Sequence, residues 1–158
     1  MTLPFLTPLD VPTLRAQGVP APFVFGQADR VRFHELDVLD HVNNARYLSW
    51  FETFRIAYLR AYGISDYAGE RPVLVLKSVS VDYNAPLHLD DAYIVAGRTR
   101  AFRNTSWTME YGVFAGGRLC ASSEAVIVLM ESDFVTRKRL PARYTRAFID
   151  RDGARFEG

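Results

Sequence analysis

One segment, residues 43–62, limits the possible architectures of this chain more than any other, because it is apolar around most of its helical circumference. Its apolar side chains recur at helical spacing and form two broad stripes: Tyr47, Leu48, Trp50, Phe51, Phe54, Ile56, Ala57, Tyr58, Leu59 and Ala61. Gly63 is a natural end for such a helix. A helix of this kind must be covered on several sides, and a short chain can do this if a curved sheet folds around it.

The rest of the chain has the composition of that sheet. The segment 29–36 alternates apolar and polar residues, which predicts a half-buried strand. Four further segments are long and rich in β-forming residues: 71–84, 90–103, 105–115 and 118–131. Asn104 and the pair Gly116-Gly117 mark tight hairpin connections. We therefore predict an α+β fold, in which a five-stranded antiparallel sheet wraps around one long central helix.

A length of 158 residues suits one domain with a single sizeable core. Residues 1–26 contain five prolines and no clean period, and we expect an extended arm that packs on the surface or on a partner subunit. We assign the domain to residues 27–150, with a short helix after Pro141, and a C-terminal tail to residues 151–158.

The charge balance and the cysteine content narrow the class of protein. Nineteen Lys and Arg face 18 Asp and Glu, which argues against a large non-specific nucleic-acid surface but leaves room for a local basic patch. Cys120 is the single cysteine, so no intrachain disulfide can form, and a reducing cytoplasmic setting fits best. The sequence has no signal-peptide pattern, and its apolar runs are too short to span a bilayer, so we expect no membrane partner.

Several polar residues gather directly before the long helix: Asp37, Asp40, His41, Asn43 and Asn44. Asp40 or Asn43 could simply cap the helix, with Asp37 a polar loop residue. The same residues also suit catalysis. A helix N-terminus offers backbone N–H groups to an oxyanion, a carboxylate can attack or activate water, and an imidazole can orient the substrate or move a proton. The residue types alone leave both interpretations open.

Other chemistries have less support. The string HELDVLDH differs from the zinc pattern H-E-x-x-H because Val38 stands at the fifth position, and His34 and Asp37 would point to opposite faces of a strand. The chain contains no G-x-S-x-G, G-x-G-x-x-G or Walker loop. We therefore expect no metal site and no cofactor.

The stretch LDVLDHVNNARYLSWFETFRIAYL resembles the 4-hydroxybenzoyl-CoA thioesterase-like branch of the hotdog-fold acyl thioesterases. The matching features are Asp37, the pair His41-Val42, Asn44 with Tyr47, and Glu52 with Arg55. The stretch is also similar to the D-x-N-x-H-V-N-N segment of acyl-ACP thioesterases, although Leu39 stands where that motif has Asn. VSVDYNAPLHLDD and RKRLPARYTRAF look like further family segments, so the resemblance covers about residues 27–150.

The resemblance implies a hotdog fold and an enzyme of fatty acid metabolism that hydrolyses an acyl-CoA or acyl-ACP thioester. It also implies a homodimer or homotetramer with its sites at the subunit interface, and an exposed edge strand would suit such pairing. Asp37 would be the nucleophile or general base, and His41 would orient or polarise the substrate. The backbone N–H of Asn44, or of its neighbour Asn43, would be the oxyanion donor.

The resemblance leaves other roles open. The aromatic side chains of the helix could line an acyl pocket, but core packing explains them equally well: Tyr47, Trp50, Phe51 and Phe54. Glu52 and Arg55 are most simply an ion pair. Four basic residues could meet the phosphates of CoA, although ordinary surface charge is the default: Lys77, Arg98, Arg100 and Arg103.

Two alternative functions are consistent with the same fold. A hotdog hydratase or dehydratase would use a His and a carboxylate from a different motif, often H-F-P-G, which this sequence lacks. A non-catalytic acyl-CoA-binding module would bind the thioester without turnover.

Overall fold

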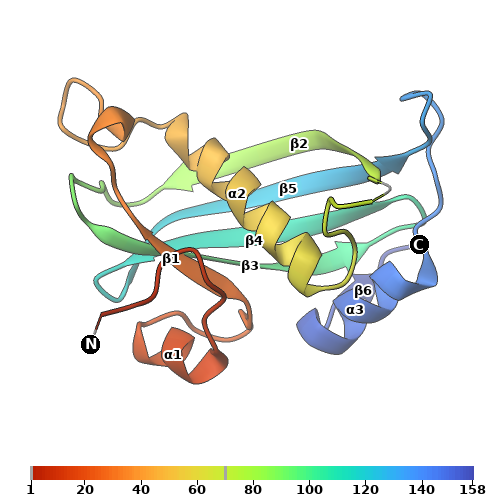
Figure 1. Ribbon diagram of the computed structural model, residues 1–158, viewed down its shortest axis with the longest axis horizontal. Coiled ribbons are helices and arrows are strands. Elements are labelled where there is room, and N and C mark those ends of the chain that lie inside the picture. Colours follow the sequence, from red (N-terminus) through yellow and green to blue (C-terminus); the bar gives the residue numbers. More distant parts are fainter. Residues whose placement is uncertain (1, 70) are drawn as a thin grey trace.

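A long helix, α2 (Arg46–Ala61), lies across one face of a curved antiparallel sheet in the computed structural model, which describes residues 2–69 and 71–158 (Figure 1). The strands stand in the order β1 (Gly26–Arg30), β3 (Ala92–Phe102), β4 (Ser106–Ala115), β5 (Arg118–Met130) and β2 (Val73–Tyr83). The two-residue β6 (Arg155–Phe156) pairs with β3 in parallel and adds a sixth strand. The predicted α+β architecture is confirmed.

The first predicted strand is displaced along the sequence. β1 ends at Arg30, and the 3₁₀ turn η1 (Phe33–Glu35) occupies the rest of the predicted segment 29–36. The alternation continues past the end of the strand because Phe33 holds an apolar position in the pattern, although its side chain is exposed in the turn. Glu35 turns inward instead, and its carboxylate accepts hydrogen bonds from the Arg32 backbone N–H (2.8 Å) and from the Trp50 indole N–H (2.6 Å), which bends the chain toward α2.

The helix α2 approaches the sheet most closely over β3. A Cβ atom built on Gly97 would lie 2.7 Å from Phe54 and 2.8 Å from Tyr111, so only glycine fits this position without movement of its neighbours. Phe51 stacks on Tyr111, with the ring centroids 4.9 Å apart. The buried face of α2 and the concave face of the sheet therefore form one continuous core.

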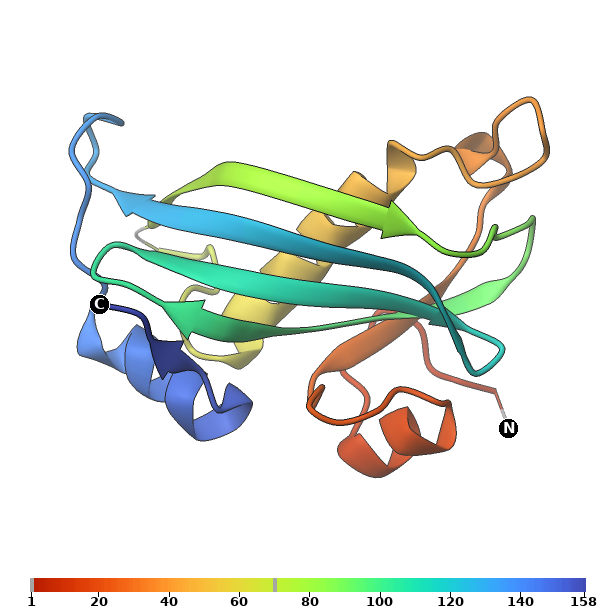
Figure 2. The same ribbon diagram turned by 180° about the vertical axis from the view of Figure 1, so that it is seen from behind.

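The N-terminal residues cover the opposite face of the sheet near β1. They include a short helix, α1 (Val11–Ala16), so the arm is not extended throughout as predicted. Leu14 and Val19 pack there against Ile94 and Phe114 in a second apolar cluster. Figure 2 shows the ribbon of this N-terminal segment, with its short helix, beside β1. The backbone N–H groups of Leu6 and Leu9 bond to the outer edge of β1.

The helix predicted after Pro141 is confirmed as α3 (Ala142–Asp152). Its last residue, Asp152, is buried, and it accepts hydrogen bonds from the hydroxyls of Tyr58 and Tyr62 and from the Thr99 backbone N–H. Burial raises the pKa of the Asp152 carboxyl. This network ties α3 to α2 and β3. No helix within residues 2–69 or 71–158 is long and apolar enough to cross a membrane.

Candidate active site

The loop between η1 and α2 is held in one shape by its own backbone. Leu36 and Val42 form an antiparallel bridge, and the Asp37 N–H donates to the His41 carbonyl over 2.7 Å. The Val42 N–H donates to the carbonyl of Leu87, which fastens the loop to the turn that follows β2. Asp40 lies at the tip with a φ of 60°, a conformation that Asp and Asn tolerate better than most residues.

Asp37 presents one engaged and one available carboxylate oxygen. Its Oδ1 accepts hydrogen bonds from the backbone N–H groups of Leu39 (2.8 Å) and His41 (3.2 Å). Its Oδ2 makes no hydrogen bond with any residue that the structure describes, and the side chain is half-buried. Asp37 therefore both shapes the loop and offers an oxygen to a ligand or to water.

The start of α2 differs from the prediction. The helix begins at Arg46, with Ala45 at the N-cap and no side chain capping it, so neither Asp40 nor Asn43 is the N-cap residue. The Asn43 side chain instead accepts a hydrogen bond from the Ala45 N–H over 2.9 Å, within the turn before the helix. Asn43 lies two residues before the N-cap, and its side chain stabilises the turn that leads into the helix.

The two candidate oxyanion donors differ in their hydrogen bonds. The Asn43 N–H donates to the carbonyl of Glu35 over 2.8 Å and is thus occupied. The Asn44 N–H has no partner among the described residues. The Asn44 carbonyl is fixed from the other side by the hydroxyl of Tyr83, which donates to it over 2.8 Å.

A pocket of about 360 Å³ brings together four of the predicted site residues: Asp37, His41, Asn44 and Tyr47. The end of β2 and the following turn complete it, through Tyr83 and Pro86 among others. The ring of Tyr47 is buried at its base, and burial raises the pKa of its hydroxyl to about 12. The pocket thus combines a carboxylate, a backbone N–H donor and an apolar wall.

Sequence reasoning missed two residues of this region. Tyr83 packs edge-on against Tyr47, with centroids 5.2 Å apart, and His88 packs edge-on against His41 at 5.1 Å. A signal was present, because both residues belong to the segment VSVDYNAPLHLDD that carries part of the family resemblance. That segment suggested a strand and a turn, and it did not indicate that the turn folds back on the loop before α2.

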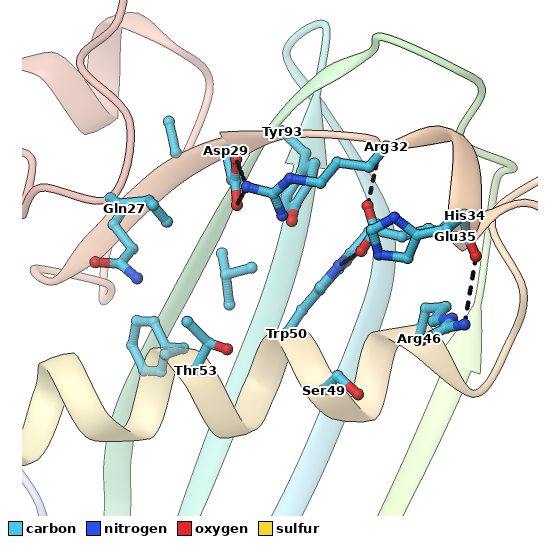
Figure 3. Close-up of a pocket in the computed structure, with 14 residues that line it drawn as sticks. Gln27, Asp29, Arg32, His34, Glu35, Arg46, Ser49, Trp50, Thr53 and Tyr93 are labelled. Carbon is cyan, nitrogen blue, oxygen red and sulfur yellow. Dashed lines mark hydrogen bonds and ion pairs between the residues drawn. The ribbon is translucent and has the colours of Figure 1, made fainter.

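The other three predicted acyl-pocket residues lie elsewhere. Trp50 and Phe54 line a separate pocket between α2 and β1 (Figure 3), and Phe51 lies in the core against Tyr111. The expected ion pair between Glu52 and Arg55 does not form within the described residues. Arg55 instead donates to the hydroxyl of Tyr111 over 3.2 Å, because that hydroxyl lies on the sheet side of the helix.

The four basic residues considered for phosphate binding do not form one group. Arg98 pairs with Glu110 and also donates to the Asp152 carbonyl. The other three line one depression together with Arg137: Lys77, Arg100 and Arg103. In the described part of the chain, no cluster of three or more His, Cys, Asp and Glu side chains could hold a metal ion.

The fold and the loop at the start of α2 define a thioesterase-like protein. A model of the thioesterase-like superfamily matches residues 31–148, and the chain belongs to that superfamily. The fold and family expected from the resemblance, a hotdog-fold thioesterase, are thereby confirmed.

Three individual proteins are similar to this chain over most of its length. An acyl-CoA thioester hydrolase, YbgC of Escherichia coli O6:H1, is 26% identical over 122 residues, which are 75% of this chain and 91% of the relative. A crystal structure of a thioesterase superfamily protein from Jannaschia sp. CCS1 is 41% identical, with a TM-score of 0.91 and coverage of 97% and 98% of the two chains. A Thermus thermophilus thioesterase, solved with coenzyme A and zinc, is 32% identical, with a TM-score of 0.68 and coverage of 80% and 94%.

Proposed function

We propose that this protein hydrolyses acyl-CoA thioesters to a free acid and a thiol, with Asp37 as the catalytic carboxylate. The observation that carries the proposal is the placement of the Asp37 carboxylate and the unpartnered N–H of Asn44 in one pocket. The name of the E. coli relative and the coenzyme A bound to the T. thermophilus relative support the substrate class.

The thioester carbonyl would bind at the N-terminal end of α2. There the Asn44 N–H and the positive end of the helix stabilise the negative charge that develops on the carbonyl oxygen. The Tyr83 hydroxyl holds the Asn44 peptide in place through its carbonyl. His41 lies beside Asp37 and orients the substrate, and the ring of Tyr47 contacts the start of the acyl group.

Asp37 has two possible routes to the same products. As a nucleophile, Oδ2 attacks the thioester carbon, the thiolate leaves, and water hydrolyses the resulting mixed anhydride. As a general base, the carboxylate takes a proton from water, whose oxygen attacks the carbon directly. A single turnover in H₂¹⁸O separates these routes if water attacks the anhydride at the aspartyl carbon. The nucleophilic route then puts ¹⁸O into Asp37, and the general-base route puts it into the released acid.

A homodimer joined through β2 would complete the site. The arm bonds to the outer edge of β1, whereas β2 pairs only with β5 among the described residues. An open edge strand is a ready surface for another strand. The end of β2 contributes Tyr83 to the Asp37 pocket, so a second copy at this edge would border the pocket. A homotetramer would be two such dimers, and the buried Cys120 thiol suits a cytoplasmic location.

A thiol-release assay tests the function directly. The protein is mixed with a thiol reagent and a panel of acyl-CoA substrates from acetyl to palmitoyl, with benzoyl-CoA and one acyl-ACP as further arms. Release of thiol with at least one substrate is the expected result, and the two carrier arms show whether CoA or ACP is preferred. Binding without release would identify a binding module, and addition of water to an enoyl-CoA would identify a hydratase.

A further inference from the structure

A second pocket, of about 290 Å³, lies between β1 and α2 (Figure 3). An apolar cavity of ~150 Å³ holds benzene, so this pocket has room for a larger ring compound. Trp50, Phe54 and Val95 form its apolar wall. Trp50 stacks on Tyr93, with centroids 4.0 Å apart, and bonds to Glu35, so this wall is rigid before any ligand arrives.

The second pocket is lined by a side-chain amide without a protein partner. Gln27 on β1 is only 7% exposed, and its side chain makes no hydrogen bond with any other described residue. Figure 3 shows this amide directed from β1 toward α2, into the space between the two elements. Its amide atoms still reach the open pocket, because neither is among the fully buried side-chain atoms of the described residues that lack a partner. They are therefore free to hydrogen-bond a molecule inside the pocket.

The charged groups around the pocket already have partners. Asp29 pairs with Arg32 at 3.2 Å, and both carboxylate oxygens of the buried Glu35 accept hydrogen bonds. The Arg46 guanidinium donates to the His34 carbonyl over 3.3 Å at the rim. The lining thus carries two carboxylates and two guanidinium groups, of which Asp29 and Arg32 form an ion pair. An ion placed beside Gln27 would lose part of its hydration, and Gln27 offers it no counter-ion.

We propose that this pocket binds a small neutral carboxamide with an apolar body. A carboxamide offers one donor and one acceptor, which match the acceptor and donor of the Gln27 amide in two parallel hydrogen bonds. The Thr53 hydroxyl, on the α2 side of the same space, is a further neutral partner. The apolar body of the ligand packs against Trp50 and Phe54.

This site is separate from the Asp37 pocket. The two pockets have no lining residue in common, and the contacting rings of Tyr47 and Trp50, with centroids 4.8 Å apart, stand between them. The proposal therefore does not depend on the hydrolase activity, and its test does not use that activity.

Three probes with the same ring and different head groups test the ligand class: benzamide, benzoate and benzylamine. Gln27 and Gln17 are the two glutamines of the chain, so their side-chain N–H₂ signals can be assigned in a ¹H–¹⁵N spectrum with one variant each. We expect benzamide to shift the Gln27 side-chain signal saturably. Benzoate and benzylamine should bind at least about tenfold more weakly, because each leaves the amide only partly satisfied.

Gln27→Leu removes the amide and keeps the size of the side chain, and Gln17→Leu is the same change at the end of α1, outside the pocket. Benzamide affinity should fall at least about tenfold in Gln27→Leu and stay unchanged in Gln17→Leu. Gln27→Leu should also keep the melting temperature, because the amide has no hydrogen bond with a described residue to lose. Absence of a saturable Gln27 shift in the unaltered protein, equal affinity in Gln27→Leu, or tighter binding of either ion would overturn the proposal.

Discussion

At the scale of single residues, Trp50 both packs in the core and fixes the position of the backbone segment before α2. Its ring is buried and stacks on Tyr93, while its N–H donates to the buried carboxylate of Glu35. That bond fixes η1 against α2, and η1 leads directly into the loop that holds Asp37. The role of Trp50 is therefore primarily structural.

Replacing Trp50 or Phe54 by alanine should destabilise the protein more than it changes the choice of substrate. Deleting a core aromatic side chain typically costs ~3–5 kcal/mol, and neither residue lines the Asp37 pocket. Urea unfolding measures the first effect, and relative thiol release across the acyl-CoA panel measures the second. Leu48→Ala, on the exposed side of α2, is the control with a small expected effect. A retained melting temperature with a shifted chain-length preference would show that these residues contact the acyl chain.

At the level of helices and strands, the contact between α2 and β3 depends on one position. Gly97→Ala should lower the free energy of unfolding by about 1–3 kcal/mol, because the added methyl would overlap Phe54 and Tyr111 in a packed core. Gly69→Ala is the matched control, since a Cβ there meets nothing within 4 Å. Chemical denaturation of both variants measures the difference. Equal stability of the two would mean that α2 does not pack on β3 as described.

The helix and the four strands from β2 to β5 were predictable because each has a strong local signal. A helix apolar on most sides has few possible environments, and the strands are β-rich runs bounded by Asn104 and Gly116-Gly117. The first strand was misplaced because Phe33 continues the apolar alternation although it is exposed, and because the bond of Glu35 to Trp50 joins distant residues. The α1 helix within the arm was missed, although Asp10 caps its N-terminus and Pro12 stands in its first turn. The boundaries of the domain at residues 27 and 150 stay predictions.

The candidate site was predictable only in part. The motif placed Asp37, His41, Asn44 and Tyr47 together because they are close in sequence. The occupied N–H of Asn43 and the support from Tyr83 depend on tertiary contacts that no local pattern encodes.

For the molecule as a whole, the number of buried tyrosines predicts a loss of stability at high pH. Burial raises the pKa of Tyr47 to about 12, and it raises the pKa of other buried tyrosines too: Tyr58, Tyr62, Tyr93 and Tyr111. An unfolded tyrosine loses its proton near pH 10, whereas a folded one keeps it. The stability that these neutral buried tyrosines contribute is therefore complete below about pH 10 and is lost as the pH rises above that value.

Each such tyrosine should remove about 1.4 kcal/mol of stability per pH unit between the two pKa values. Urea unfolding at pH 8, 10 and 11.5 measures the slope. Tyr47→Phe should make the fall of the unfolding free energy with pH less steep by about the contribution of one tyrosine. It should leave stability near pH 8 largely unchanged, since no described residue bonds to the Tyr47 hydroxyl. A constant free energy of unfolding across this pH range would contradict the raised pKa values of the buried tyrosines.

The proposed assembly predicts a particle of at least twice 17.9 kDa in light scattering at micromolar concentration. Val79→Lys, a charge on the exposed surface of β2, should shift the protein toward monomer because two lysines would approach each other across the paired strands. Val135→Lys adds the same charge at a more exposed position outside the sheet and should leave the assembly intact. A stable monomer of the unaltered protein would exclude both the β2 dimer and an interface site.

The central claim is that the Asp37 carboxylate carries out the hydrolysis, and thiol release by Asp37→Asn tests it most directly. The amide oxygen can still accept the hydrogen bonds of Leu39 and His41, so circular dichroism and acyl-CoA binding should be kept. Turnover should fall at least about a hundredfold, because general-base assistance alone is worth ~10²–10⁴-fold and a covalent role more. Asp40→Asn is the control with a small expected effect, since asparagine also tolerates the positive φ at that position. Near-normal turnover by Asp37→Asn would contradict the mechanism, and an inactive Asp40→Asn would show that the catalytic carboxylate is Asp40.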